Sequence, residues 1–163
     1  MEYIWAPWRM EYIEKHSEAK ECFLCAAASG RGELVVARES QYLVVMNKFP
    51  YNSGHILVAP MRHVSRLEDL SVDERFALME GVTLFSQVVQ EALNPQGQNI
   101  GVNLGRVAGA GLEEHLHVHI VPRWNGDTNF MPVLADVTVV PEHIERTCDK
   151  LKAVYSRLKA ERS

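Results

Sequence analysis

The chain has 163 residues, of which 47% are hydrophobic and 23% are charged, with three cysteines and a formal net charge of −4 at pH 7. This length predicts one domain, residues 1–163, with a substantial core, and the odd number of cysteines argues against a disulfide framework. The acidic balance without a Lys/Arg cluster argues against a nucleic-acid partner, and because no membrane-length apolar run or signal peptide is present, we expect a cytoplasmic protein away from membranes.

Residues 1–32 are predicted to form an N-terminal arm. Its first part is rich in aromatic residues such as Trp5 and Trp8, and we favour their packing over the core to direct ligand contact. The run Cys22-Phe23-Leu24-Cys25 is a C-x-x-C motif, which is consistent with zinc binding, redox chemistry or two buried thiols. Redox chemistry would favour a βαβ setting that the surrounding sequence lacks, whereas zinc requires two more ligands from elsewhere.

Three segments rich in Val, Tyr and other strand-forming residues are predicted to pair as an antiparallel meander. They are residues 33–37, 42–47 and 55–60. The connections between them are short, and the second one contains Pro50 and Gly54, which are typical turn residues.

A long central helix is predicted over Val72–Leu93. It begins with a capping box, Ser71-Val72-Asp73-Glu74, and it ends before Asn94-Pro95. Apolar residues at spacings of three and four predict an amphipathic stripe, formed by Phe76, Met79, Val82, Phe85 and Val89.

The remaining elements complete an α+β pattern. Residues 99–104 alternate like a strand, residues 133–140 suggest a short edge strand, and residues 141–162 suggest a C-terminal helix. We therefore expect an antiparallel sheet of about five strands, with the helices on one face and the other face open for a ligand.

The run from His115 to Trp124 (HLHVHIVPRW) carries three histidines that alternate with aliphatic residues. On a strand, the histidines would share one face and the aliphatic residues the other. The first and third histidines would lie roughly 13 Å apart at their Cα atoms, which disfavours one metal ion shared by all three. Upstream, the small residues Gly109-Ala110-Gly111 would let backbone N–H groups approach an anion. Together these features suggest phosphorus chemistry with an imidazole as nucleophile or as acid–base catalyst, and the alternatives are a solvated strand face and a flexible loop.

The run from His115 to Val121 resembles the signature of the histidine triad (HIT) superfamily of nucleotide hydrolases and transferases, in which three histidines alternate with apolar residues. Other stretches are similar to the bacterial branch that includes diadenosine tetraphosphate phosphorylases. They are residues 5–9 (WAPWR), 47–60 (NKFPYNSGHILVAP), 108–111 (AGAG) and 122–130 (PRWNGDTNF). The resemblance covers nearly the whole chain and implies the HIT fold and a homodimer in which two sheets join into one, although the periodicity itself shows no interface.

The resemblance also implies roles for single residues. His117 would be the nucleophile, and His119 and His55 would contact phosphate and the bridging oxygen. Asn47 matches a position that helps hold the nucleoside in relatives, and the alternative for it is a turn residue at the end of a strand. The remaining candidates for nucleotide or phosphate binding are Asn103, the backbone N–H groups of Gly109, Ala110 and Gly111, and His115.

A structural zinc ion is a further implication of the resemblance. In zinc-bearing relatives, the first triad histidine joins a cysteine pair and a histidine that follows the Gly-His strand. The ligands here would be Cys22, Cys25, His63 and His115, with His16 as a substitute for His63. Such an ion would fasten the N-terminal arm to the catalytic strand.

The leading interpretation is an enzyme that cleaves a dinucleoside polyphosphate through a nucleotidyl-His117 intermediate, with phosphate or water as the second acceptor. Alternatives within enzymes are a nucleoside phosphoramidate hydrolase or an adenylyl-sulfate-splitting relative. An alternative of a different class is a nucleotide-binding regulator in which turnover is incidental.

Overall fold

The computed structural model describes residues 21–127 and 142–162. The aromatic residues of the arm, His16 and the predicted edge strand 133–140 lie outside the described residues. Among the described residues, no helix combines the length and apolar character needed to span a membrane.

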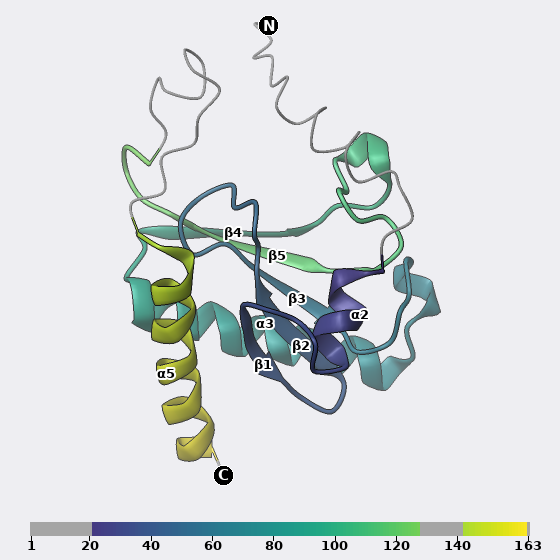
Figure 1. The fold of residues 1–163 in the computed structure, drawn as a ribbon, viewed down its shortest axis with the longest axis horizontal. Coiled ribbons are helices and arrows are strands. Elements are labelled where there is room, and N and C mark those ends of the chain that lie inside the picture. Colours follow the sequence, from purple (N-terminus) through teal and green to yellow (C-terminus); the bar gives the residue numbers. More distant parts are fainter. Residues whose placement is uncertain (1–20, 128–141, 163) are drawn as a thin grey trace, which may run out of the picture.

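An antiparallel sheet of five strands forms the centre of the molecule, in the order β1-β2-β3-β5-β4 (Figure 1). Its strands are β1 (Val35–Arg38), β2 (Tyr42–Met46), β3 (Ile56–Pro60), β4 (Gly97–Val102) and β5 (Val118–Arg123). The first three strands form the predicted meander, while β5 inserts between β3 and β4. The predicted α+β class and sheet are thus confirmed, and most strand ends differ from the predicted ones by one or two residues.

The strand that carries the histidines begins later than the alternation predicts. It starts at Val118, so His115 and His117 precede the strand and only His119 lies within it. The pairing with β3 ends at Val58 opposite Val118. Beyond this pair Pro60 has no N–H to donate, and the Leu116 N–H donates to the Val64 carbonyl instead, at 2.6 Å. The predicted separation of faces survives, because the aliphatic residues Leu116, Val118 and Ile120 all lie in the main hydrophobic core.

Helix α3 (Val72–Leu93) has the bounds that the sequence predicts. Its capping box is formed, since the Glu74 N–H donates to Ser71 Oγ at 3.1 Å and the Ser71 N–H donates to the Glu74 carboxylate at 2.8 Å. The predicted stripe is wrong at its N-terminal half: Phe76 and Met79 are 68% and 63% exposed, whereas its other members, Val82, Phe85 and Val89, are buried. The helix therefore meets the sheet mainly along its C-terminal half.

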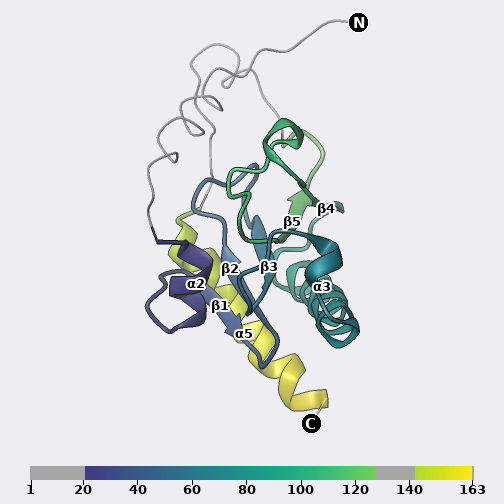
Figure 2. The same ribbon diagram turned by 90° about the vertical axis from the view of Figure 1, so that its right-hand side faces the viewer.

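Helix α5 (Ile144–Arg162) packs beside α3 on the same face of the sheet (Figure 2). Its Tyr155 ring stacks on Phe85 of α3, with centroids 5.0 Å apart. Burial of one face of each helix against the sheet builds the main core.

The opposite face of the sheet is partly covered by a helix that was not predicted, α2 (Phe23–Ala28). Leu24 and Ala27 of this helix pack on apolar side chains of β2 and β3, which are Leu43, Val45, Leu57 and Ala59. Leu57 is paired with His119 across β3 and β5, so the second core and the histidines occupy the same face. The sequence predicts that the face opposite the long helices is open, and this is wrong at the end of the sheet that α2 covers.

Candidate active site and metal site

Four histidines gather on the α2 side of the sheet. His119 lies on β5, His115 and His117 lie in the segment that leads into this strand, and His55 directly precedes β3. Each of the four side chains is at most 9% exposed. Burial of an imidazole disfavours its charged form, so these rings are suited to act as neutral bases, nucleophiles or metal ligands.

A hydrogen bond to one ring nitrogen of His117 leaves the lone pair of the other nitrogen available. Its Nδ1 lies 2.7 Å from the backbone carbonyl oxygen of His115. A carbonyl only accepts, so Nδ1 carries the proton and Nε2 carries the lone pair. Burial lowers the pKa of His117, although the hydrogen bond to the carbonyl opposes this shift. The ring is therefore a neutral imidazole with its Nε2 ready to attack an electrophile.

His55 and His119 form a directed hydrogen-bonded pair. The backbone N–H of Tyr51 donates to His55 Nδ1 at 3.1 Å, and His55 Nε2 lies 2.9 Å from His119 Nδ1. Burial, followed by the neighbouring His119 and His117, lowers the pKa of His55 to about 3. A neutral His55 that accepts at Nδ1 has its proton on Nε2, which donates to His119, and the proton of a neutral His119 is then on Nε2.

The turn that carries Tyr51 is tied to both sides of the site. Asn47 caps it, because the Phe49 N–H donates to Asn47 Oδ1 at 3.0 Å, and the Asn47 amide nitrogen lies 3.2 Å from His55 Nδ1. The amide of Asn52 donates to the Pro122 carbonyl at 3.0 Å and to Asp127 at 2.7 Å. Asn47 thus has both roles considered for it, as a turn residue and as a contact of the site. The sequence does not predict Tyr51 and Asn52 as site residues, because only their place in a turn distinguishes them.

The small-residue loop before the triad has a defined shape. Gly109 has φ 90° and ψ 20°, a left-handed conformation that glycine adopts without steric cost. The Asn103 amide donates to the Gly109 carbonyl at 3.3 Å, and Ala110 is buried. Gly111 is exposed and is not among the described glycines with positive φ. The loop is therefore shaped mainly at Gly109, and Asn103 helps to hold it.

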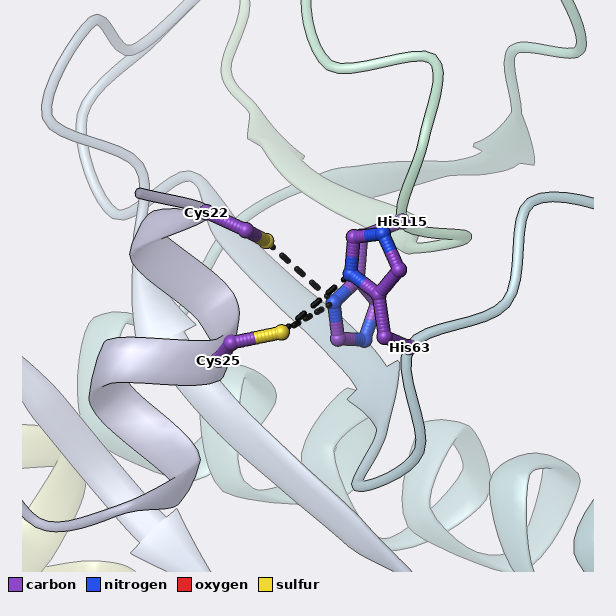
Figure 3. Close-up of side chains that lie close together, drawn as sticks. All are labelled: Cys22, Cys25, His63 and His115. Atoms are coloured by element: carbon purple, nitrogen blue, oxygen red, sulfur yellow. Dashed lines mark hydrogen bonds between the residues drawn. The ribbon is translucent and has the colours of Figure 1, made fainter. Parts of the chain in front are cut away.

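A second cluster lies beside the triad. Cys22, Cys25, His63 and His115 each present a ligand atom, and these atoms lie within 4.8 Å of one another (Figure 3). The Sγ–Nδ1 separations are 3.4 Å for Cys22 to His115, 3.5 Å for Cys25 to His115 and 3.2 Å for Cys25 to His63. They approximate the edges of a tetrahedron, about 3.5 Å, around an ion bonded to sulfur and nitrogen. The four predicted ligands thus come together as a cluster that could bind a metal ion.

The chemistry of these donors also fits a cation. His115 Nε2 donates to the Pro60 carbonyl at 2.9 Å, which leaves the Nδ1 lone pair facing the thiols. Burial, followed by the neighbouring Cys22, raises the pKa of Cys25 to about 11. Without a cation the Cys25 thiol therefore resists ionisation, and a bound metal would stabilise it as a thiolate.

The model of the HIT domain family matches residues 31–126, which is more than half of the chain. The chain belongs to the HIT domain family. This HIT protein is 38% identical over 164 residues to AP-4-A phosphorylase of Mycobacterium tuberculosis, with 94% of this chain and 84% of the relative covered. It is 36% identical over 124 residues to the asymmetrical bis(5'-nucleosyl)-tetraphosphatase of Schizosaccharomyces pombe, covering 76% of this chain and 64% of the relative.

Among solved structures, this HIT protein is similar to a zinc-bound histidine triad family protein from Mycobacterium smegmatis. The TM-score is 0.71 at 25% sequence identity, and the match covers 86% of this chain and 97% of the other. A histidine triad nucleotide-binding protein from Sulfolobus tokodaii also has a TM-score of 0.71, at 27% identity and with 85% and 94% of the two chains covered. The fold is therefore the HIT fold.

Proposed function

We propose that this HIT protein cleaves dinucleoside polyphosphates, with diadenosine tetraphosphate as a substrate, through a nucleotidyl-His117 intermediate. The observation that carries the proposal is the hydrogen bond from His117 Nδ1 to the His115 carbonyl, which leaves Nε2 as a buried neutral nucleophile. The mycobacterial and fission-yeast relatives, whose names describe enzymes of such substrates, support the choice of substrate class.

In the first step, the lone pair of His117 Nε2 forms a bond to phosphorus, and the bond from phosphorus to the leaving oxygen breaks with its electron pair going to the leaving nucleotide. The His117 ring gains positive charge, and its Nδ1–H remains bonded to the His115 carbonyl. The donor at His119 Nε2, oriented through His55, would stabilise negative charge that develops on the phosphate oxygens and the bridging oxygen.

In the second step, phosphate or water attacks the same phosphorus, and the P–N bond breaks to return the lone pair to His117; an attacking water releases its proton to solvent. The Gly109–Gly111 loop would approach the nonbridging oxygens in both steps. The N–H groups of Gly109 and Ala110 donate to the carbonyls of Arg106 and Gly105, at 2.9 and 3.3 Å, so the phosphate would share these donors with the loop. Asn47 would contact the nucleoside from the turn beside His55, and Asn103 would act by keeping the loop in shape.

Zinc is the metal that the second cluster fits best, since two thiolates and two imidazoles are a common tetrahedral set for this ion. Cys22, Cys25, His63 and His115 would fill all four positions and leave none for a water molecule. The ion would supply structural stability and no step of the reaction. The zinc-bound mycobacterial neighbour supports this choice.

A time course with diadenosine tetraphosphate, with and without inorganic phosphate, tests the proposed function. ADP plus ATP formed only with phosphate identifies a phosphorylase, whereas AMP plus ATP, or two ADP, formed in water identifies a hydrolase. Tight binding without any product would reject catalysis in favour of a nucleotide-binding regulator. Cleavage of a nucleoside phosphoramidate with the dinucleotide untouched would reject the substrate class.

We also propose that the protein is a homodimer in which two copies of β4 meet. Among residues 21–127 and 142–162 this strand is an edge of the sheet, and its central residues Asn99, Ile100 and Gly101 are exposed. An unpaired edge with an exposed apolar side chain invites a second strand. Light scattering should therefore give twice the mass of the chain, and the mass of a single chain for Ile100→Lys. A monomeric parent protein would contradict the proposal.

A further inference from the structure

We propose that Tyr51 is a positioning residue that holds the His55–His119 pair in the arrangement that catalysis requires. The inference rests on the proposed function, because the reaction there uses a donor at His119 Nε2. Tyr51 contacts this pair at two points, with its backbone on His55 and with its ring on both imidazoles.

The backbone contact selects the tautomer of His55. A peptide N–H only donates, so the 3.1 Å contact from the Tyr51 N–H requires a lone pair at His55 Nδ1. The proton of His55 is then directed at His119, 2.9 Å away. The turn that presents this N–H is anchored by Asn52, whose amide donates to the Pro122 carbonyl on β5.

The ring contact fixes the plane of His119. The Tyr51 ring lies 5.7 Å from the His119 ring at an interplanar angle of 23°, and 4.8 Å from the His55 ring at 37°. His117 contacts the His119 imidazole edge-on, with the two ring centroids 4.9 Å apart. His119 is therefore packed by Tyr51 on one side and by the nucleophile on another, and removal of the tyrosine ring frees rotation about its side-chain bonds.

The exposure of Tyr51 marks it as the outer layer of this stack. Its side chain is 44% exposed, whereas the imidazoles behind it are at most 9% exposed. The ring thus separates the directed pair from water, which would otherwise compete for the hydrogen bond between the two histidines. An exposed aromatic ring could instead stack directly on a substrate base, and the two roles differ in the kinetic constant that they affect.

The test compares Tyr51→Leu, which removes the aromatic plane but keeps the backbone N–H, with Tyr51→Phe, which keeps the plane. We expect Tyr51→Leu to lower kcat about 10- to 100-fold with little change in KM, and Tyr51→Phe to restore most of the rate. Phe49→Leu, at another exposed aromatic residue of the same turn, should leave kcat within about twofold of the parent value.

A raised KM with an unchanged kcat in Tyr51→Leu would overturn the proposal and assign the ring to base stacking. Loss of rate in Tyr51→Phe equal to that in Tyr51→Leu would also overturn it, because the hydroxyl would then be the acting group.

A second readout needs no substrate. Long-range 1H–15N spectra of the ligand-free protein should show both His55 and His119 protonated at Nε2, and in Tyr51→Leu the His119 signals should move toward a mixture of tautomers. Unchanged His119 signals in the variant would reject the positioning role. If the parent protein turned over no dinucleotide, the proposed function would fail, while these spectra would still decide whether Tyr51 orders the pair.

Discussion

His115 takes part in two sites with different parts of the same residue. Its Nδ1 faces the two cysteines of the metal cluster, and its backbone carbonyl accepts the hydrogen bond from His117 Nδ1 at 2.7 Å. The position of a proposed metal ligand and the tautomer of the proposed nucleophile are therefore set by one residue. Alternation in the sequence indicates that the histidines share a face, but it carries no information on which nitrogen of each ring is protonated.

Replacement of His117 by glycine tests the nucleophile. We expect turnover to be lost, because glycine has no imidazole to form the bond to phosphorus, while nucleotide affinity stays close to that of the parent protein and the variant still folds. Steady-state rates, isothermal titration with a non-hydrolysable dinucleotide and a thermal melt measure the three quantities. Near-normal turnover would refute the role of His117.

The burial of His55 predicts how stability depends on pH. Its pKa is lowered from 6.5 to about 3 in the folded protein. As pH falls below about 6.5, His55 is therefore protonated in the unfolded chain but stays neutral in the folded one. This group therefore stabilises the fold above pH 6.5, and that stabilisation is lost as pH falls toward 3. The free energy of unfolding should decrease by about 1.4 kcal/mol per pH unit for this single group.

The measurement is a denaturant titration between pH 8 and pH 5 on the parent protein and on His55→Gln, whose amide can accept and donate but does not titrate. The difference between the two slopes isolates His55, because His117 and His119 are present in both proteins. Identical slopes would show that His55 is protonated in the folded state as readily as in the unfolded state.

At the scale of elements, the sequence predicts those boundaries that local chemistry determines. Helix α3 begins and ends where predicted, since a capping box and an Asn-Pro pair act within one turn of the helix. Helix α2 was missed because its six residues are too few for a period, and it is held by the packing of Leu24 and Ala27. The late start of β5 was missed because it depends on Pro60 of a different strand.

The residues of the candidate site also fall into two groups: those that a local sequence pattern predicts and those whose contacts depend on the fold. The triad and the C-x-x-C motif are visible as local patterns, and the family resemblance adds His63, which the fold brings to the cysteines from 38 residues away. Tyr51 and Asn52 carry no local signature, because their contacts depend on how one turn meets the end of β5.

The loop before the triad can be tested at its two glycines. Gly109→Val forces a Cβ into a left-handed conformation, so we expect nucleotidyl transfer to slow about 10²–10³-fold and nucleotide binding to weaken. Gly111→Val should have a smaller effect, because this residue is exposed and has no positive φ. Stability should fall by only about 1–2 kcal/mol in Gly109→Val. Equal affinity and rate in both folded variants and the parent would mean that the loop is a plain connection.

At the scale of the whole molecule, a metal ion bound by the Cys/His cluster would join α2 to residues far along the chain, since Cys22 and His115 are 93 positions apart. A bond that closes so long a loop restricts the unfolded chain strongly. Removal of zinc with a chelator should therefore lower Tm by about 5–15 °C.

Cys22→Ser should show the same lowered Tm and no further change with chelator, which separates loss of the ion from other effects of the reagent. Elemental analysis of freshly purified protein gives the metal content directly. Protein without metal, or an unchanged Tm in Cys22→Ser, would contradict the fastening role.

The order of strands has a consequence for how the protein is made. β5 is the last described strand to leave the ribosome, yet it pairs with β3 on one side and β4 on the other. Until it is synthesised, β4 has no neighbour within the described sheet, and β3 has an open edge. The strand that completes the sheet carries His119 and directly follows His115 and His117, so a nascent chain arrested before Val118 should remain sensitive to protease. A molecule whose sheet has formed therefore also has its histidines in place. We expect the fraction of folded molecules to equal the fraction of catalytically competent molecules.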